Sequence, residues 1–264
     1  MRELRPGLWH WTAPHPEWRS SEPWDQNVSS YAIDDGEHLL FFDPIAPPSE
    51  LEKLAAERET SIVLTAPWHE RDMQGLVERH GMPVYAPSPD SAEDLMRMFG
   101  LTAEQAGDGS PDLVWLRAER PDNWRPYAAG DRLPAGIETF PGHKRNDIVL
   151  WNESHRAVIA GDTLVDFGSG LEMNARWLEA VGATREQVVG GLQPLLQLPV
   201  EHVLATHGGP FDRADLERVL SPSRPAAPSP ERSAGPVYSR APNSRFSIPS
   251  SCAHSMRVAC PKRR

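Results

Sequence analysis

Short apolar runs separated by turn-forming residues dominate the start of the chain. Three such runs lie at residues 8–11, 28–33 and 38–42, and the sequence Asp34-Asp35-Gly36 separates the last two. An Asp-Gly pair between apolar runs is typical of the tight turns that join antiparallel strands. The pattern therefore predicts an N-terminal β-meander.

Helical spacing first appears after this meander. Residues 48–59 begin with a proline and a serine at a capping position, and Leu51, Leu54 and Ala55 repeat at helical spacing before an apolar run at residues 61–65. The same patterns predict helices at residues 72–79, 91–99, 185–196 and 212–220, and strands at residues 137–140, 148–151, 157–160 and 202–205. Strands and helices interleave in both halves of the chain, which is typical of a layered α/β architecture.

Composition and charge divide the 264 residues into a body and a tail. Residues 221–264 are rich in Pro, Ser and Arg, show no apolar period, and carry eight basic residues against the single acid Glu231, a balance of +7. We expect this segment to be a disordered basic tail. Residues 1–220 hold 19 basic and 36 acidic side chains, a balance of −17, and are predicted to form the folded domain.

The charge and the cysteines exclude several classes of function. A body this acidic repels phosphates, so we expect a small-molecule substrate or ligand and no nucleic acid. No apolar run approaches the roughly 18 residues of a membrane helix, and the N-terminus lacks the pattern of a signal peptide, so we expect a cytoplasmic protein and no membrane partner. Both cysteines, Cys252 and Cys260, lie in the tail. Any metal in the body must therefore be held by His, Asp or Glu.

Three segments place a possible metal ligand beside a glycine directly after an apolar strand. They are Phe-Pro-Gly-His ending at His143, Val-Ile-Ala-Gly-Asp ending at Asp162, and Val-Leu-Ala-Thr-His-Gly around His207. Side chains at the ends of several strands can converge on one site, and glycine lets the chain turn sharply there. Two His and one Asp are a suitable donor set for zinc, iron or manganese.

The order of these motifs resembles the metallo-β-lactamase superfamily along nearly all of residues 6–212, with Asp43 and Thr65 following two earlier strands. The resemblance implies an α/β (α+β) fold, a four-layer αββα metallo-β-lactamase sandwich with a one- or two-metal site at the sheet edges. On this resemblance His143 is a ligand of the first metal, Asp162 bridges both metals and His207 is a ligand of the second. Asp43 corresponds to an aspartate that orients ligands.

The chain departs from the family at its first motif. Where the family has Thr-His-x-His-x-Asp-His, this sequence reads Thr-Ala-Pro-Trp-His-Glu-Arg-Asp from Thr65. Ala66 and Trp68 stand at the two first-site histidines, Glu70 at the catalytic aspartate and Arg71 at the final histidine. Neither metal site is complete, so the resemblance implies one ion at most.

Two hypotheses follow from this altered motif. In the first, one zinc, iron or manganese ion is held by His143, Asp162 and His207, with His69 or Glu70 reaching in from the loop. The protein would then be a hydrolase of a small ester, thioester or related bond, in which a metal-activated water is oriented by Glu70 or Asp72.

In the second hypothesis the site holds no metal. The guanidinium of Arg71 pairs with Asp162 in place of the cation, and the cleft serves as a non-catalytic binding scaffold. In both hypotheses Trp68 lies at the cleft, where it shapes the pocket or plugs it. The tryptophans that cluster before residue 25, Trp24 among them, are expected to pack in the core.

Overall fold

The first of two β-sheets contains seven strands in chain order. The computed structural model describes residues 1–99, 102–107 and 110–221. The strands of this sheet are β1 (Arg2–Arg5), β2 (Leu8–Pro14), β3 (Asn27–Asp34), β4 (His38–Phe42), β5 (Glu59–Val63), β6 (Val84–Pro87) and β7 (Trp124–Tyr127). Strands β1 to β4 pair antiparallel, and β2 to β4 form the predicted meander, to which β1 adds an edge strand that was not predicted. Strands β4 to β7 pair parallel. The parallel pairs require crossovers, and helices supply them.

The second sheet contains six strands in the order β13-β12-β11-β10-β9-β8. Their bounds are β8 (Arg132–Leu133), β9 (Ile137–Pro141), β10 (Ile148–Asn152), β11 (Ala157–Ile159), β12 (His202–Leu204) and β13 (Pro210–Phe211). Only β11 and β12 pair parallel in this sheet. Their crossover carries α6 (Ala175–Val181), α7 (Arg185–Leu192) and the 3₁₀ helix η3 (Gln193–Gln197).

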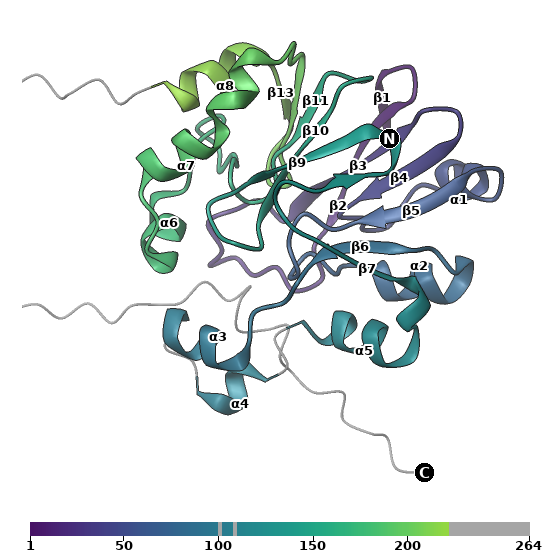
Figure 1. Ribbon diagram of the computed structural model, residues 1–264, viewed down its shortest axis with the longest axis horizontal. Coiled ribbons are helices and arrows are strands. Elements are labelled where there is room, and N and C mark those ends of the chain that lie inside the picture. The colour runs from purple at the N-terminus through teal and green to yellow at the C-terminus, as the bar shows by residue number, and fades with distance from the viewer. Residues whose placement is uncertain (100–101, 108–109, 222–264) are drawn as a thin grey trace, which may run out of the picture.

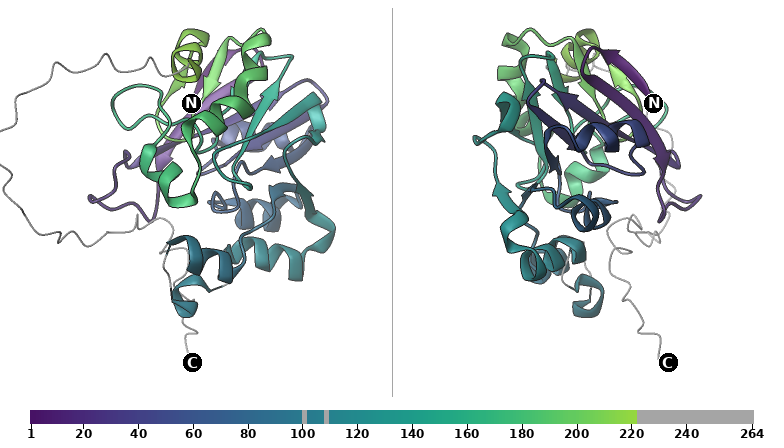
Figure 2. Two further views of the ribbon diagram at one scale, coloured as in Figure 1. Left: turned by 60° about the vertical axis from the view of Figure 1, so that its left-hand side comes forward. Right: turned by 90° about the vertical axis from the view of Figure 1, so that its right-hand side faces the viewer.

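Helices cover the outer face of each sheet (Figure 1). The helices α1 (Ser49–Ala55), α2 (Met73–His80) and α5 (Pro111–Glu119) share a core with the first sheet. The helices α6, α7 and α8 (Arg213–Leu220) share a core with the second. The structure thus has the four αββα layers that the resemblance implies. The segment with α3 (Ala92–Phe99) and α4 (Ala103–Ala106) extends beyond the sheets (Figure 2).

A third apolar core lies between the sheets. Tyr31, Leu40 and Phe42 from the first sheet meet Ile148 and Leu150 from the second, and all five are fully buried. Alternate residues of β4, such as Phe41, face the helices on the other side of the sheet. Because both faces of β4 are covered, its sequence is almost continuously apolar.

Several expected elements end earlier than predicted. The helix expected over residues 185–196 stops at Leu192, because Pro194 has no backbone N–H, and the chain continues as η3.

The expected tail, with Cys252 and Cys260, falls outside the described residues except for Ser221. None of the helices in the described ranges has the length and hydropathy that a membrane crossing requires.

Candidate metal centre

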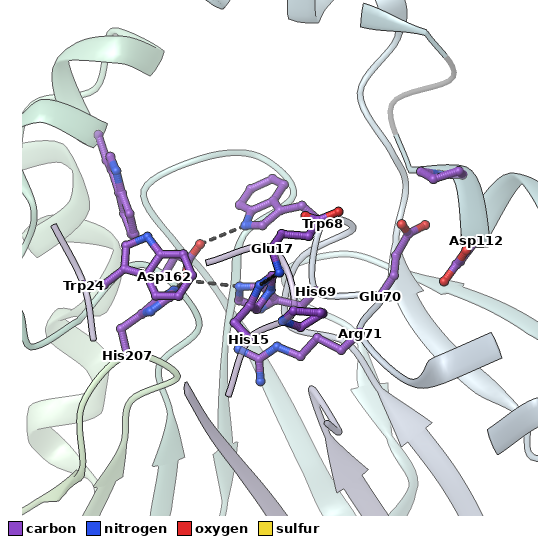
Figure 3. A pocket seen from close by; sticks show the side chains of 13 residues that line it. His15, Glu17, Trp24, Trp68, His69, Glu70, Arg71, Asp112, Asp162 and His207 are labelled. Atoms are coloured by element: carbon purple, nitrogen blue, oxygen red, sulfur yellow. Dashed lines mark hydrogen bonds and ion pairs between the residues drawn. The ribbon is translucent and has the colours of Figure 1, made fainter. Parts of the chain in front are cut away.

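A cavity of about 190 Å³ lies where several strands end. Its walls come from the loops after β5, β11 and β12, from the loop between β2 and β3, from helix α6, and from the start of α5. The lining residues are His15, Pro16, Glu17, Trp24, Trp68, His69, Glu70, Arg71, Pro111, Asp112, Asp162, Trp177 and His207. Figure 3 shows most of these side chains. Residues far apart in the sequence therefore form one pocket.

Three possible metal ligands converge on one side of this pocket. The donor atoms of His69, Asp162 and His207 all lie within 4.8 Å of one another, and all three residues are buried. The Nε2 atoms of His69 and His207 lie 3.2 and 3.5 Å from Oδ1 of Asp162. Two imidazoles and a carboxylate form a common donor set for zinc.

The predicted ligand His143 is not a member of this group. Its Nδ1 lies 2.6 Å from Oδ2 of Asp147, and its backbone N–H donates to the hydroxyl of Thr163. The ring of Trp177 stacks on it with 6.3 Å between centroids, and the same indole lies 6.0 Å from His207. The donor atoms that converge are thus not those of the predicted trio, and a ligand role for His143 stays a prediction. His69, from the altered loop, takes its place beside Asp162 and His207.

Asp147, which the sequence analysis missed, holds the turns that carry His143 and Asp162. Its fully buried carboxylate accepts hydrogen bonds from the backbone N–H of Asp162 and from the Thr163 hydroxyl. A Cβ atom at Gly161, where φ is +55°, would lie 2.5 Å from this carboxylate. Only glycine fits this close approach.

Asp43 and Thr65 fix the orientation of His69. The Asp43 carboxylate lies 3.1 Å from Nδ1 of His69 and accepts hydrogen bonds from the backbone N–H and the hydroxyl of Thr65. Burial lowers the pKa of His69, but the carboxylates of Asp162 and Asp43 outweigh this effect and raise the pKa to about 10. Without a metal ion, His69 is thus an imidazolium between two carboxylates.

His207 is a neutral imidazole in an aromatic enclosure. Burial lowers its pKa to about 3, and the Arg71 charge adds to this effect against the pull of Asp162. The centroid of the Trp24 ring lies 4.8 Å from that of the His207 imidazole. The buried Nδ1 of His207 has no hydrogen-bond partner among the described residues. Although burial alone would raise the pKa of Asp162, the charge of His69 holds it well below the ordinary value.

Arg71 does not form the predicted pair with Asp162. Its Nη1 donates to the backbone carbonyls of Asp43 and Ser29, at 2.6 and 2.9 Å. No ion pair joins it to Asp162 within the described part of the chain. Backbone carbonyl groups of the first sheet hold the guanidinium. The Arg71–Asp162 pair that the metal-free hypothesis predicted is therefore wrong. In the absence of an ion, the cation that contacts Asp162 is His69.

The two predicted acid-base residues lie in different places. Glu70 lines the pocket, and its Oε1 accepts the backbone N–H of Leu113 at 2.7 Å. Burial raises its pKa to about 8. Figure 3 shows it beside Asp112, across the pocket from His207. Asp72 is exposed, does not line the pocket and accepts the backbone N–H of Ala46. Of the two residues, Glu70 lies where it could exchange a proton with a molecule in the pocket, and Asp72 does not.

Trp68 does lie at the cleft, as its motif position predicts. Its Nε1 donates to Oδ2 of Asp162 at 2.8 Å, and its ring lies 4.6 Å from the Lys144 ammonium. The sequence analysis missed the pocket roles of His15, Trp24 and Trp177. Trp24 was expected only in the core, and Trp177 lies on α6, which no clear apolar period predicts.

Comparison with known proteins identifies the fold. No protein-family model matches the chain, and no curated protein matches it by sequence. Among solved structures, VMB-1 superposes with a TM-score of 0.53 and 15% identity over 83% of this chain and 93% of that one. A metallo-beta-lactamase superfamily protein from Sulfolobus tokodaii superposes with a TM-score of 0.52 and 16% sequence identity, over 80% of this chain and 84% of that one. A metallo-beta-lactamase family protein from Thermus thermophilus superposes with a TM-score of 0.51 and 20% sequence identity, over 83% of this chain and 78% of that one. The chain therefore has the metallo-β-lactamase fold.

Proposed function

We propose that this protein is a hydrolase that uses a single metal ion held by His69, Asp162 and His207. The observation that carries the proposal is the convergence of their three donor atoms within 4.8 Å at the wall of a pocket. Three protein ligands leave an open position for water or substrate, which is the usual composition of a catalytic zinc site.

The surroundings of the donors fit a divalent cation. The Asp43 carboxylate can accept a hydrogen bond from the Nδ1–H group of His69. The neutral imidazole then carries its lone pair on Nε2, which faces Asp162. His207 is neutral and also offers a lone pair. Zinc suits this set, and iron or manganese also accept it. When bound, such an ion would act as a Lewis acid and lower the pKa of a water molecule in the pocket.

Residues on the other side of the pocket support proton transfer. Because the pKa of Glu70 is about 8, its carboxyl group can release and take up a proton near neutral pH. We assign it the role of proton donor and acceptor. The indoles of Trp24, Trp68 and Trp177 exclude water from the walls.

We propose that the substrate is a small ester, thioester or related molecule and not a nucleic acid. The cavity of about 190 Å³ is smaller than the several hundred Å³ typical of drug-sized ligand pockets. The excess of acidic residues in the body also disfavours binding to phosphate backbones.

A metal-free binding scaffold is the second candidate function. The observation in its favour is that His69, with a pKa of about 10, can itself supply the positive charge between Asp43 and Asp162. In this candidate His69 replaces Arg71 as the substitute for the cation.

Metal analysis of four proteins separates the two candidates. Wild type, His69→Ala, His207→Ala and the matched control His143→Ala are purified without chelator and analysed by plasma mass spectrometry. We expect about one ion per chain in wild type and His143→Ala, and far less than one in the other two, because only they lose a ligand.

Activity is then measured on p-nitrophenyl acetate and on acetyl thiocholine as ester and thioester probes. Hydrolysis that disappears with chelator and returns with zinc supports the hydrolase. Metal-free wild-type protein that hydrolyses neither probe contradicts the proposal and supports the scaffold. Hydrolysis that chelator does not change contradicts both candidates.

A further inference from the structure

The two carboxylate oxygens of Asp162 have different partners. Oδ1 faces the donor nitrogens of His69 and His207. Oδ2 accepts the indole N–H of Trp68 at 2.8 Å. Only 7% of Asp162 is exposed, so neither oxygen can turn to solvent for other partners. The indole thus leaves one oxygen of this carboxylate facing the histidines.

The indole of Trp68 is held in turn by a buried ion pair. The ammonium of Lys144 lies 4.6 Å from the centroid of the ring, which is within the range of a cation–π interaction. Lys144 also pairs with Asp90, and both side chains are only 7% exposed. A fixed positive charge therefore lies against the indole whose N–H contacts Asp162.

We infer that Trp68, supported by Lys144, takes the place of a second cation at Asp162 and restricts the site to one ion. The N–H group uses Oδ2, which a second ion would need as a ligand. The Lys144 ammonium would repel that ion. This inference rests on the proposed single-metal site and explains why that site takes one ion.

The same contact gives Trp68 a positioning role for the first ion. By donating to Oδ2, the indole keeps Oδ1 of Asp162 turned toward His69 and His207. Partners that orient a metal ligand in this way commonly change metal affinity by about 10- to 100-fold when they are removed.

Zinc binding to the full-length chain tests the inference. Stoichiometry is measured by equilibrium dialysis with plasma mass spectrometry, and the Kd by competition with a chromogenic chelator. Trp68→Phe keeps an aromatic ring but removes the N–H, and Trp68→His replaces the N–H donor with a nitrogen that can be a ligand. Trp115→Phe, on α5 outside the pocket lining, is the matched control.

We expect one ion per chain in wild type and in Trp115→Phe, with equal Kd. Trp68→Phe should still bind one ion, with a Kd about 10- to 100-fold higher. Trp68→His should bind one ion more than wild type. Circular dichroism and melting curves confirm that each variant is folded, and Trp68→Phe remains a test if Trp68→His does not fold.

Three results would overturn the inference: two ions in wild type, an unchanged Kd in Trp68→Phe, or no additional ion in folded Trp68→His. Failure of the proposed function looks different, because wild type would then bind no ion at all. In that case an ion gained by Trp68→His would still support the role of Trp68.

Discussion

His69 is the residue on which the chemistry of the pocket depends, because it lies between the carboxylates of Asp43 and Asp162. These carboxylates stabilise an imidazolium when no metal is present. If the proposed ion binds, Asp43 would orient the neutral imidazole. Metal binding must therefore release the proton of His69, and metal affinity should rise with pH.

The contact between Asp43 and His69 leads to a first prediction at this scale. Asp43→Asn should weaken zinc binding by about 10- to 100-fold, because the amide no longer holds Nδ1 of His69 as a carboxylate does. Asp72→Asn is the matched control, since it makes the same change at an exposed carboxylate outside the pocket. Chelator competition measures both Kd values. Equal values for Asp43→Asn and wild type would contradict the role of Asp43.

Glu70 gives a second prediction, on the pH dependence of stability. Its pKa is about 8 in the folded protein and 4.5 in its ordinary state, so the unfolded chain loses this proton first as pH rises. The stability that protonated Glu70 contributes is therefore present below about pH 4.5 and lost as pH rises through about 8.

The variant Glu70→Gln cannot ionise, so its stability relative to wild type should increase from pH 5 to pH 8.5, by on the order of a few kcal/mol. Urea unfolding of chelator-treated protein at several pH values measures this difference. A difference that stays constant with pH would show that the Glu70 carboxyl has an ordinary pKa.

The sequence predicts part of the candidate site and misses the rest for a physical reason. Asp162 and His207 follow apolar strands beside glycine, and this local pattern is visible in one sequence. That His69 joins them depends on how the loop after β5 of the first sheet packs against the loops after β11 and β12 of the second, and these loops are far apart in the sequence. No local pattern contains that information.

At the scale of elements, the close packing of turns fixes the ends of strands β9 and β11. A Cβ atom at Gly142, directly after β9, would overlap the carbonyl oxygen of Asp147 and Oγ1 of Thr163. Backbone atoms cannot yield to such a contact without displacing the turn. Glycine is therefore required here for space.

This packing leads to a matched pair of glycine substitutions. Gly142→Ala should lower the free energy of unfolding by about 2–4 kcal/mol because of overpacking. Gly190→Ala, at an exposed position of α7 with open space where the Cβ would lie, should raise it by about 0.5–1 kcal/mol through helix propensity. Denaturant titration measures both. Similar effects at the two sites would contradict the packing argument.

Strands that bury a continuous apolar run could be predicted, whereas three short elements that contain a proline could not. Strands β4 and β10 are entirely apolar or nearly so, and the sequence analysis finds both. Strand β6 ends in a proline, β7 contains one, and α5 begins with one, so their periodicity is short or broken. Tertiary packing, and not local propensity, stabilises such segments.

At the scale of the whole molecule, the pocket requires both halves of the sandwich. His69 follows β5 of the first sheet, whereas Asp162 and His207 follow β11 and β12 of the second. Tyr31 of the first sheet donates to the carbonyl of Ala205 in the second, which joins the two sheets close to His207. The donor group therefore forms only when the two sheets have packed together.

A final prediction concerns the part of the chain that this assembly needs. Helix α8 buries Leu216, Val219 and Leu220 against the second sheet, and Ser221 accepts a hydrogen bond from Arg185 on α7. The folded domain is therefore expected to need the chain through Ser221. A chain that ends at Ser221 should melt within about 2 °C of the full-length protein, because the Pro-, Ser- and Arg-rich composition of residues 222–264 predicts a disordered tail, and such a tail contributes little stability.

A chain that ends before α8, at residue 211, is the contrasting control. It should melt at least about 10 °C lower or fail to fold, because three buried apolar side chains are lost at about 1.5–3 kcal/mol each. Scanning calorimetry measures all three proteins. A fall of many degrees in the chain that ends at Ser221 would mean that residues 222–264 pack against the domain, and the boundary drawn from composition would then be wrong.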